Sequence, residues 1–152
     1  MRFWRICRRS YAAQAASGEG ARQYGGRWNS RGVPVVYAST SLALAAVETF
    51  VHLEPLLLPD DLVSIEGEIP GSFEIGQLHL TALPPDWRRP GDESLQKFGD
   101  QWVRLGHTVA LLVPSAAIPG EWNLLLNPSH PDFSRIKFHP PIPFKFDARM
   151  FH

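Results

Sequence analysis

The chain has 152 residues, of which 44% are hydrophobic and five are tryptophan, so it is long enough for one folded domain with its own core. Fifteen basic and fifteen acidic residues give zero net charge, which argues against direct nucleic-acid binding, because such affinity rests on many phosphate contacts. Cys7 is the single cysteine, which excludes an intrachain disulfide and favours a cytoplasmic location. No apolar run approaches the roughly 20 residues of a membrane span.

In the first third, the pattern predicts a strand at 2–6, a short helix over 10–16, and a glycine-rich loop around residue 27. The β-branched and aromatic residues of 33–38 predict a second strand. Ser39, Thr40 and Ser41 offer N-caps for a helix that runs through His52 and is stopped by Pro55.

In the remainder, residues 62–69 alternate between apolar and polar side chains, which predicts a half-buried strand. Residues 70–92 are rich in proline and glycine and are expected to be irregular. The last predicted elements are a helix at 93–105, whose apolar face holds Leu95, Phe98, Trp102 and Leu105, and strands at 109–113, 122–126 and 142–146. Strands and helices mix without a regular βαβ rhythm, so the expected class is α+β, with 1–152 as one domain.

Most of the arginines lie in the first 31 residues, where Glu19 is the single acidic residue. Arginine suits the bidentate recognition of phosphate or carboxylate, although a solvated basic surface explains any one of these side chains equally well. The arginines concerned are Arg2, Arg5, Arg8, Arg9, Arg22, Arg27 and Arg31.

Arg27 is the candidate anion-binding residue, because it follows Gly25 and Gly26 and precedes Trp28. The glycines allow close backbone approach, and a guanidinium can bind two oxygens of a phosphate. The alternative is an arginine that fixes its own loop by holding a carbonyl or a carboxylate.

Glu48 is the candidate catalytic carboxylate, because it lies within an otherwise apolar helical segment, 42–51, where an unpaired charge would be costly. A salt bridge or an exposed helix edge would also explain it. Tyr37 is either a core ring or a platform for a planar ligand, and the sequence favours the core.

Ser115 and Asn127 each come at the end of an apolar strand, where ligand contacts are common, although turn chemistry beside proline explains both. The six histidines form no i,i+4 pair and no pair with a cysteine, so no metal site is expected.

Two stretches and a later motif together resemble the RES domain family. They are residues 17–37, which contain Gly25-Gly26-Arg27-Trp28-Asn29, residues 41–48, and the pair Pro114-Ser115 followed by 122–130. The arginine, glutamate and serine of the family's name correspond here to Arg27, Glu48 and Ser115.

The resemblance implies a bacterial toxin with an ADP-ribosyltransferase-like fold and a mixed, mostly antiparallel sheet. Such proteins degrade NAD⁺ by hydrolysis or phosphorolysis, with inorganic phosphate as co-substrate in the second case, and some modify a protein instead. It also implies an Xre-like helix-turn-helix antitoxin that covers the active site, and it allows a homodimer within that complex. NAD⁺ is then a substrate, and no cofactor is required.

On this resemblance, Glu48 would stabilise the positive charge that grows on the ribose, and Arg27 would hold the diphosphate. Tyr37 would stack on the nicotinamide as a third member of the catalytic set. Ser115 and Asn127 would orient the nicotinamide ribose or a phosphate. One carboxylate is sufficient because nicotinamide leaves as a neutral molecule, whereas ordinary glycosidases need a second carboxyl group to protonate the leaving oxygen.

Overall fold

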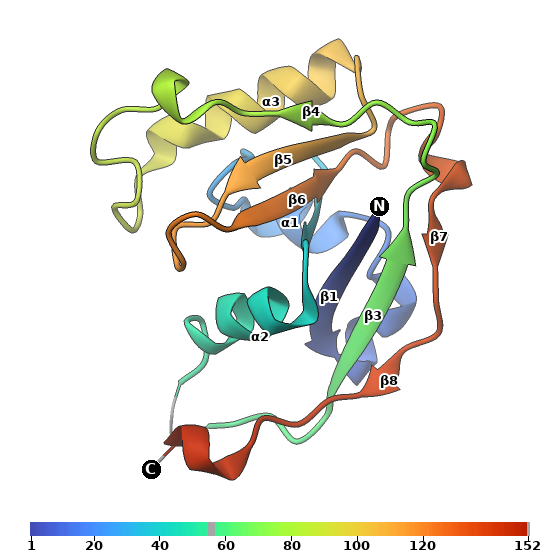
Figure 1. Cartoon of the computed structure of the whole chain (residues 1–152), viewed down its shortest axis with the longest axis vertical. Helices are drawn as coiled ribbons and strands as arrows, with labels where there is room; N and C mark the ends of the chain where they lie inside the picture. Colours follow the sequence, from blue (N-terminus) through green and yellow to red (C-terminus); the bar gives the residue numbers. More distant parts are fainter. Residues whose placement is uncertain (55–56, 152) are drawn as a thin grey trace.

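The computed structural model describes residues 1–54 and 57–151, which form one sheet with helices packed around it (Figure 1). The strand order is β4-β5-β6-β2-β1-β3-β7, and β8 pairs with β3 beside this path. Every pairing in the described residues is antiparallel except β4 with β5, so the sheet is mixed and mostly antiparallel, as predicted. The strands are β1 (Arg2–Arg8), β2 (Val36–Ser39), β3 (Leu62–Glu68), β4 (Gly76–Gln77), β5 (Ala110–Pro114), β6 (Trp122–Leu126), β7 (Lys137–Phe138) and β8 (Ile142–Pro143).

The sheet divides where β1 meets β2. β1 pairs with β3 along its whole length, from Arg2 opposite Glu68 to Arg8 opposite Leu62, but it is in register with β2 only at Trp4 and Ser39. Figure 1 shows β1 and β3 running steeply across the direction of β5 and β6. The two strands therefore diverge beyond this one pair and leave an opening between the halves of the sheet.

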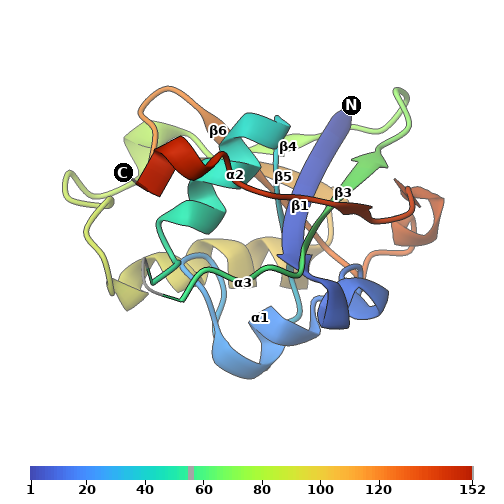
Figure 2. The same ribbon diagram turned by 90° about the horizontal axis from the view of Figure 1, so that it is seen from below.

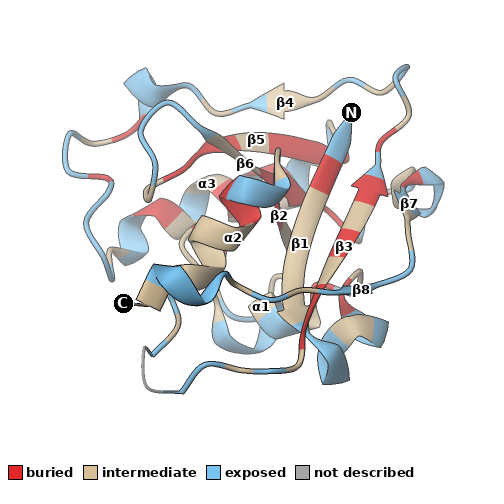
Figure 3. Cartoon of the chain, turned by 60° about the horizontal axis from the view of Figure 1, so that its bottom comes forward, coloured by how far each residue is buried: buried red, intermediate tan, exposed pale blue. Residues whose placement is uncertain are grey.

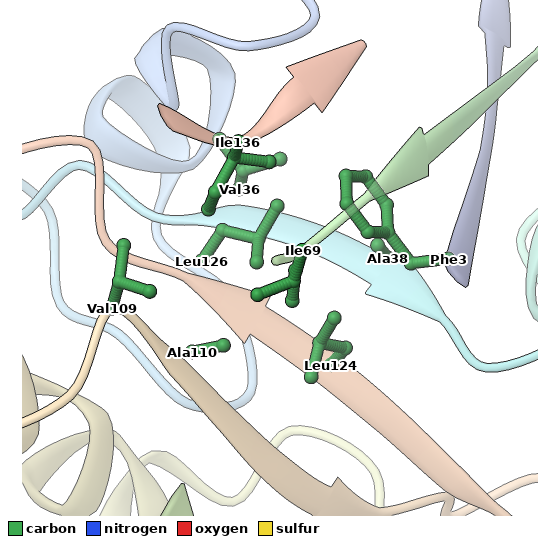
Figure 4. Packing of buried hydrophobic residues seen from close by; sticks show 9 residues of the cluster. All are labelled: Phe3, Val36, Ala38, Ile69, Val109, Ala110, Leu124, Leu126 and Ile136. Atoms are coloured by element: carbon green, nitrogen blue, oxygen red, sulfur yellow. The ribbon is translucent and has the colours of Figure 1, made fainter. Parts of the chain in front are cut away.

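Two apolar clusters pack against the sheet. One is centred on Phe3, Val36 and Leu124, shown in Figure 4, and the other on Trp28, Leu95 and Leu125. Successive strand residues point to opposite faces, which is why Leu124 and Leu125 belong to different clusters. Figure 3 shows the buried positions concentrated along the central strands.

Three α-helices and five 3₁₀ helices accompany these strands in the described residues. Figure 2 shows α1 and α2 well apart, on opposite sides of the view. The α-helices are α1 (Glu19–Tyr24), α2 (Leu42–Phe50) and α3 (Gln96–Leu105), and the 3₁₀ helices are η1 (Arg9–Gln14), η2 (Leu80–Ala82), η3 (Glu93–Leu95), η4 (Phe133–Arg135) and η5 (Ala148–Phe151).

Helix α2 begins as the sequence predicts. The Ser41 hydroxyl accepts a hydrogen bond from the backbone N–H of Leu44 at 3.0 Å, which satisfies one of the N–H groups that a helix start leaves without a partner. The helix ends at Phe50, two residues before His52. Pro55, the expected stop, lies outside the described residues.

Several expectations about local structure were wrong. Helix α1 was not expected, and Gly18 starts it with a left-handed φ of 71°. The short helix expected over 10–16, by contrast, is present as the 3₁₀ helix at Arg9–Gln14. Leu105 is 53% exposed, so it does not belong to the apolar face of α3. The expected strand 142–146 is ordered as a strand only at Ile142–Pro143, since proline cannot donate to a ladder.

Candidate active site

Glu48 lies on α2, with its carboxylate fixed by two donors from other parts of the chain. Its Oε1 atom accepts from the Ser115 hydroxyl at 2.6 Å and from Nδ2 of Asn123 at 2.7 Å. Both bonds reach the same oxygen, so Oε2 has no hydrogen-bond partner within the described residues. Oε2 is also not one of the buried side-chain atoms that lack a partner in those residues. The carboxylate is thus held in place with one oxygen free to accept from a ligand.

Ser115 helps to fix the Glu48 carboxylate. It follows β5, is 1% exposed, and its Oγ accepts from the backbone N–H of Ala117 at 3.2 Å and of Ile118 at 3.1 Å. These two bonds orient the hydroxyl so that its single proton points to Glu48. Ser115 therefore contacts Glu48, but it does not line the cleft described below.

Asn123 was missed by the sequence reasoning, which chose Asn127 four residues later. Its Nδ2 donates to Glu48, while its Oδ1 accepts from the Ser39 hydroxyl of β2 at 2.7 Å. Asn123 therefore connects α2 to the centre of the sheet. An amide inside the apolar strand 122–126 was the available signal, because such a group needs a partner.

Asn127 is placed elsewhere. It is 1% exposed, its Nδ2 donates to the carbonyl of Val103 at 3.4 Å, and its Oδ1 accepts from the N–H of Ser129 at 2.9 Å. These contacts are the turn chemistry that was the alternative explanation from sequence, and the structure does not bring Asn127 to the cleft described below.

The loop that carries Arg27 is tightly anchored. Asn29 is fully buried and donates from Nδ2 to the carbonyls of Ala21, Ser30 and Val33. The side chain of Gln96 in α3 donates to the carbonyl of Gly26 at 3.1 Å. Several independent contacts thus fix the backbone on both sides of Arg27.

Helix α3 packs closely against this loop. Asp100 accepts from the Ser30 N–H at 2.8 Å and from the Ser30 hydroxyl at 2.5 Å. A Cβ atom at Gly99 would lie 1.9 Å from the carbonyl oxygen of Trp28, so the helix and loop can pack this closely only with glycine there. None of these contacts was expected from the sequence, because about 70 residues separate the partners.

Within the described residues, the Arg27 side chain makes one hydrogen bond. Its Nη1 donates to the carbonyl of Trp87 at 3.0 Å, and no carboxylate in the described residues forms an ion pair with it. The rest of the guanidinium remains available to an anion. Trp87 comes from the irregular segment 70–92, which the sequence did not connect with the site.

Tyr37 holds the Arg27 loop from the side of β2. Its hydroxyl donates to Oδ1 of Asn29 at 2.6 Å and accepts from the Trp28 N–H at 3.1 Å. Burial raises the pKa of this hydroxyl above its ordinary value, and the negative charge of Asp100 adds to the effect. The hydroxyl therefore stays protonated and keeps its donor role, while the residue still lines the cleft.

One large cleft of about 1150 Å³ joins these elements at the opening between β1 and β2. Arg27, Tyr37, Glu48 and Asn123 all line it, together with Arg5 of β1. Small-molecule sites usually enclose about 300–1,000 Å³, so the cleft has room for a dinucleotide. Its other charged lining residues are Arg8, Arg88, Glu19, Asp92 and Glu93.

Most other arginines of the first third are already paired. Arg2 bonds with Glu66, Arg8 with Asp61, and Arg22 with Glu19, all near the surface. The described residues contain no group of three or more His, Cys, Asp or Glu side chains placed to hold a metal ion, and none of their helices is long and apolar enough to cross a membrane.

The sequence of the chain is similar to those of known proteins. The sequence pattern of the RES domain matches residues 2–147. A Sphingobium protein named Prs ADP-ribosylating toxin is 42% identical over 153 residues, covering 97% of this chain and 95% of the relative. A protein named Toxin Res from Photorhabdus laumondii subsp. laumondii is 37% identical over 152 residues, covering 99% and 97%.

A solved structure has the same fold. It is the crystal structure of the M. tuberculosis MbcT-MbcA toxin-antitoxin complex, with a TM-score of 0.67 and 19% identity over 99% of this chain and 86% of that chain. The likeness confirms the predicted α+β fold.

Proposed function

The chain belongs to the RES domain family, and on that premise we propose that it is a bacterial toxin that breaks the bond between ribose and nicotinamide in NAD⁺. The observation that carries the proposal is the doubly fixed carboxylate of Glu48 in a cleft that also holds Arg27.

The chemistry follows from the leaving group. The bond between ribose C1′ and the nicotinamide nitrogen breaks with its electron pair, and the positively charged ring departs as neutral nicotinamide. Positive charge then grows on the ribose, where the free Oε2 of Glu48 can accept from the ribose hydroxyls and stabilise it. Water, or inorganic phosphate, adds its oxygen to C1′ and loses a proton to solvent.

Arg27 and Tyr37 would position the substrate. Arg27 has guanidinium nitrogens left over from its contact with Trp87, which suits the diphosphate. Tyr37 would place its ring against the nicotinamide while its hydroxyl holds the Arg27 loop. Ser115 and Asn123 would act through Glu48.

A second activity is favoured by a specific finding. The 42% identical relative carries the name Prs ADP-ribosylating toxin, which indicates transfer of ADP-ribose to a protein. The same cleft supports that reaction when a protein side chain replaces water or phosphate at C1′. The two activities share every step up to the departure of nicotinamide.

The partner is proposed from the structural neighbour, which was solved as a toxin-antitoxin complex. We propose an Xre-like antitoxin that covers the cleft, within a complex that can also contain a toxin homodimer. Co-expression with an antitoxin of this class should abolish nicotinamide release.

The decisive experiment incubates the purified protein with NAD⁺ and follows free nicotinamide. Release without any protein supports NAD⁺ cleavage, and strict dependence on an added protein supports ADP-ribosyl transfer. Product analysis with and without inorganic phosphate separates phosphorolysis from hydrolysis. Intact NAD⁺ under all of these conditions would contradict both activities.

A further inference from the structure

Helix α2 carries a large aromatic side chain on the side opposite Glu48. Phe50, its last residue, lies two positions after Glu48. Successive residues are about 100° apart around a helix, so two positions turn the side chain by about 200°. In agreement with this geometry, Glu48 lines the cleft and Phe50 does not. A contact made by Phe50 therefore acts on the helix without reaching the substrate.

Phe50 packs against two rings from the segment 142–151. Its ring centroid lies 6.0 Å from that of Phe146 and 5.4 Å from that of Phe151. The centroids of Phe146 and Phe151 are 5.9 Å apart, so the three residues form one group, which we call the phenylalanine cluster. Separations of this size are those at which aromatic rings attract one another. Figure 2 shows the 3₁₀ helix η5, which ends at Phe151, beside α2.

The segment 142–151 is itself attached to the sheet. Its strand β8 pairs with β3, where Ile142 lies opposite Ser64. The N–H of Phe144 donates to the carbonyl of Leu62 in the same strand at 2.9 Å. The phenylalanine cluster thus connects the end of α2 to the sheet through β3.

Buried side chains hold the first half of α2 but not the end that carries Glu48. The buried residues of the helix are Leu44 and Ala45. The residues after Ala45 are all partly exposed, and Phe50 is the largest of them. Phe50 therefore offers this end of the helix its largest apolar surface for packing.

We propose that the phenylalanine cluster positions α2 so that the Glu48 carboxylate stays within reach of its two donors. The hydrogen bonds from Ser115 and Asn123 are 2.6 and 2.7 Å long, and a shift of about 1 Å at the helix end would break them. Phe146 and Phe151 are then positioning residues, because they act through Glu48 and do not line the cleft. The catalytic consequence rests on the proposed function, but the effect on α2 itself does not.

The first measurement is hydrogen exchange of the free protein, which needs no substrate. Amides in the last turn of α2 should exchange about 10-fold faster in Phe151→Ala than in the parent, because the helix end loses a ring contact. Phe133→Ala is the matched control. Phe133 is also partly buried, but its ring packs against Phe138, 6.0 Å away, and against the apolar cluster around Phe3. This control should lower stability to urea and leave exchange in α2 as it is in the parent.

The second measurement is nicotinamide release from NAD⁺. Phe151→Ala should lower kcat by about 10-fold with little change in KM, because the carboxylate is displaced while Arg27 keeps its place. Phe151→Leu retains an apolar side chain and should recover most of kcat. Phe133→Ala should keep the kcat of the parent. A general loss of stability would lower the folded fraction of both alanine variants, so it would not produce this difference.

The proposal is overturned if α2 exchanges equally fast in Phe151→Ala and the parent, or if Phe133→Ala accelerates exchange to the same extent. Faster exchange with unchanged kcat would also overturn it, because the cluster would then not act through Glu48. A parent that leaves NAD⁺ intact removes the proposed function, and the exchange result alone then decides whether the cluster positions α2. If Phe151→Ala does not fold, Phe151→Leu takes its place. A smaller acceleration of exchange is then expected, and none would contradict the proposal.

Discussion

Asn123 donates from Nδ2 to Oε1 of Glu48 over 2.7 Å, although 75 positions separate the two residues in the chain. The same oxygen receives the hydroxyl of Ser115, so both donors act on one side of the carboxylate. Oε2 is left to face a ligand. This division of the two oxygens is what makes Glu48 a fixed acceptor rather than a mobile surface acid.

Replacing Glu48 by glutamine should keep the shape of the side chain and remove its charge. We expect kcat for nicotinamide release to fall by about 10²–10³, the usual loss when one electrostatic contact to a transition state is removed. KM for NAD⁺ should change little, because Arg27 and the cleft remain. Turnover within a few-fold of the parent would show that the carboxylate does not stabilise the reacting ribose.

Asn123→Ala should lower kcat by about 10- to 100-fold, because the carboxylate loses one of its two donors and becomes less well positioned. Thr40→Val is the control, since the Thr40 hydroxyl binds the carbonyl of the neighbouring Trp122 without touching Glu48. Steady-state kinetics on both variants checks the prediction. Equal effects of the two substitutions would contradict a specific role for Asn123.

Arg27→Lys should weaken NAD⁺ binding by about 10- to 100-fold, because a point charge cannot hold two phosphate oxygens as a guanidinium does. Arg31→Lys, at an exposed position four residues later, should bind as the parent does. Calorimetric titration into proteins that also carry Glu48→Gln avoids consumption of NAD⁺. Unchanged affinity in the Arg27 variant would place the phosphate site elsewhere.

Gly99→Ala should displace the loop that carries Arg27, because Gly99 of α3 packs against it. The added Cβ would lie 1.9 Å from the Trp28 carbonyl, so α3 must shift, and we expect a loss of about 1–3 kcal/mol in unfolding free energy together with a raised KM. Gly20→Ala in α1 meets no atom within 4 Å and should stabilise by about 0.4–1 kcal/mol. Urea unfolding and NAD⁺ kinetics measure both effects, and a harmless Gly99→Ala would contradict the packing described here.

Tyr37 should make stability fall at alkaline pH. Its pKa in the folded protein is raised, chiefly by burial, above the value near 10 expected in the unfolded chain. Below that value both states hold the proton and the contribution is complete. As the pH rises above about 10, the unfolded chain loses its proton first, so the unfolding free energy decreases.

Urea unfolding between about pH 8 and 11 tests this dependence. The decrease should be smaller in Tyr37→Phe, which has no phenolic proton to lose, and unchanged in Tyr24→Phe, whose ring is 75% exposed. A decrease of the same size in Tyr37→Phe would show that another group is responsible.

Much of the fold could be predicted from local patterns. Alternation of apolar and polar residues found β3, apolar runs found β5 and β6, and the N-cap at Ser41 found the start of α2. Where tertiary contacts compete with local preference, the prediction was wrong. Helix α1 forms beside two glycines, and the Ala21 carbonyl within it accepts from the buried Asn29. The spacing of residues along the chain does not predict this contact.

The amino-acid sequence by itself determined that this chain has an α+β fold, because composition and periodicity are properties of neighbours along the chain. It also singled out Arg27 and Glu48 as candidates, and the family resemblance added Tyr37 to the proposed site. Only the tertiary structure decided that Asn123 supports the carboxylate while Asn127 does not, and that α3 fixes the Arg27 loop. Those outcomes depend on which strands pair and how closely helices pack, and contacts between residues about 70 positions apart leave no local trace.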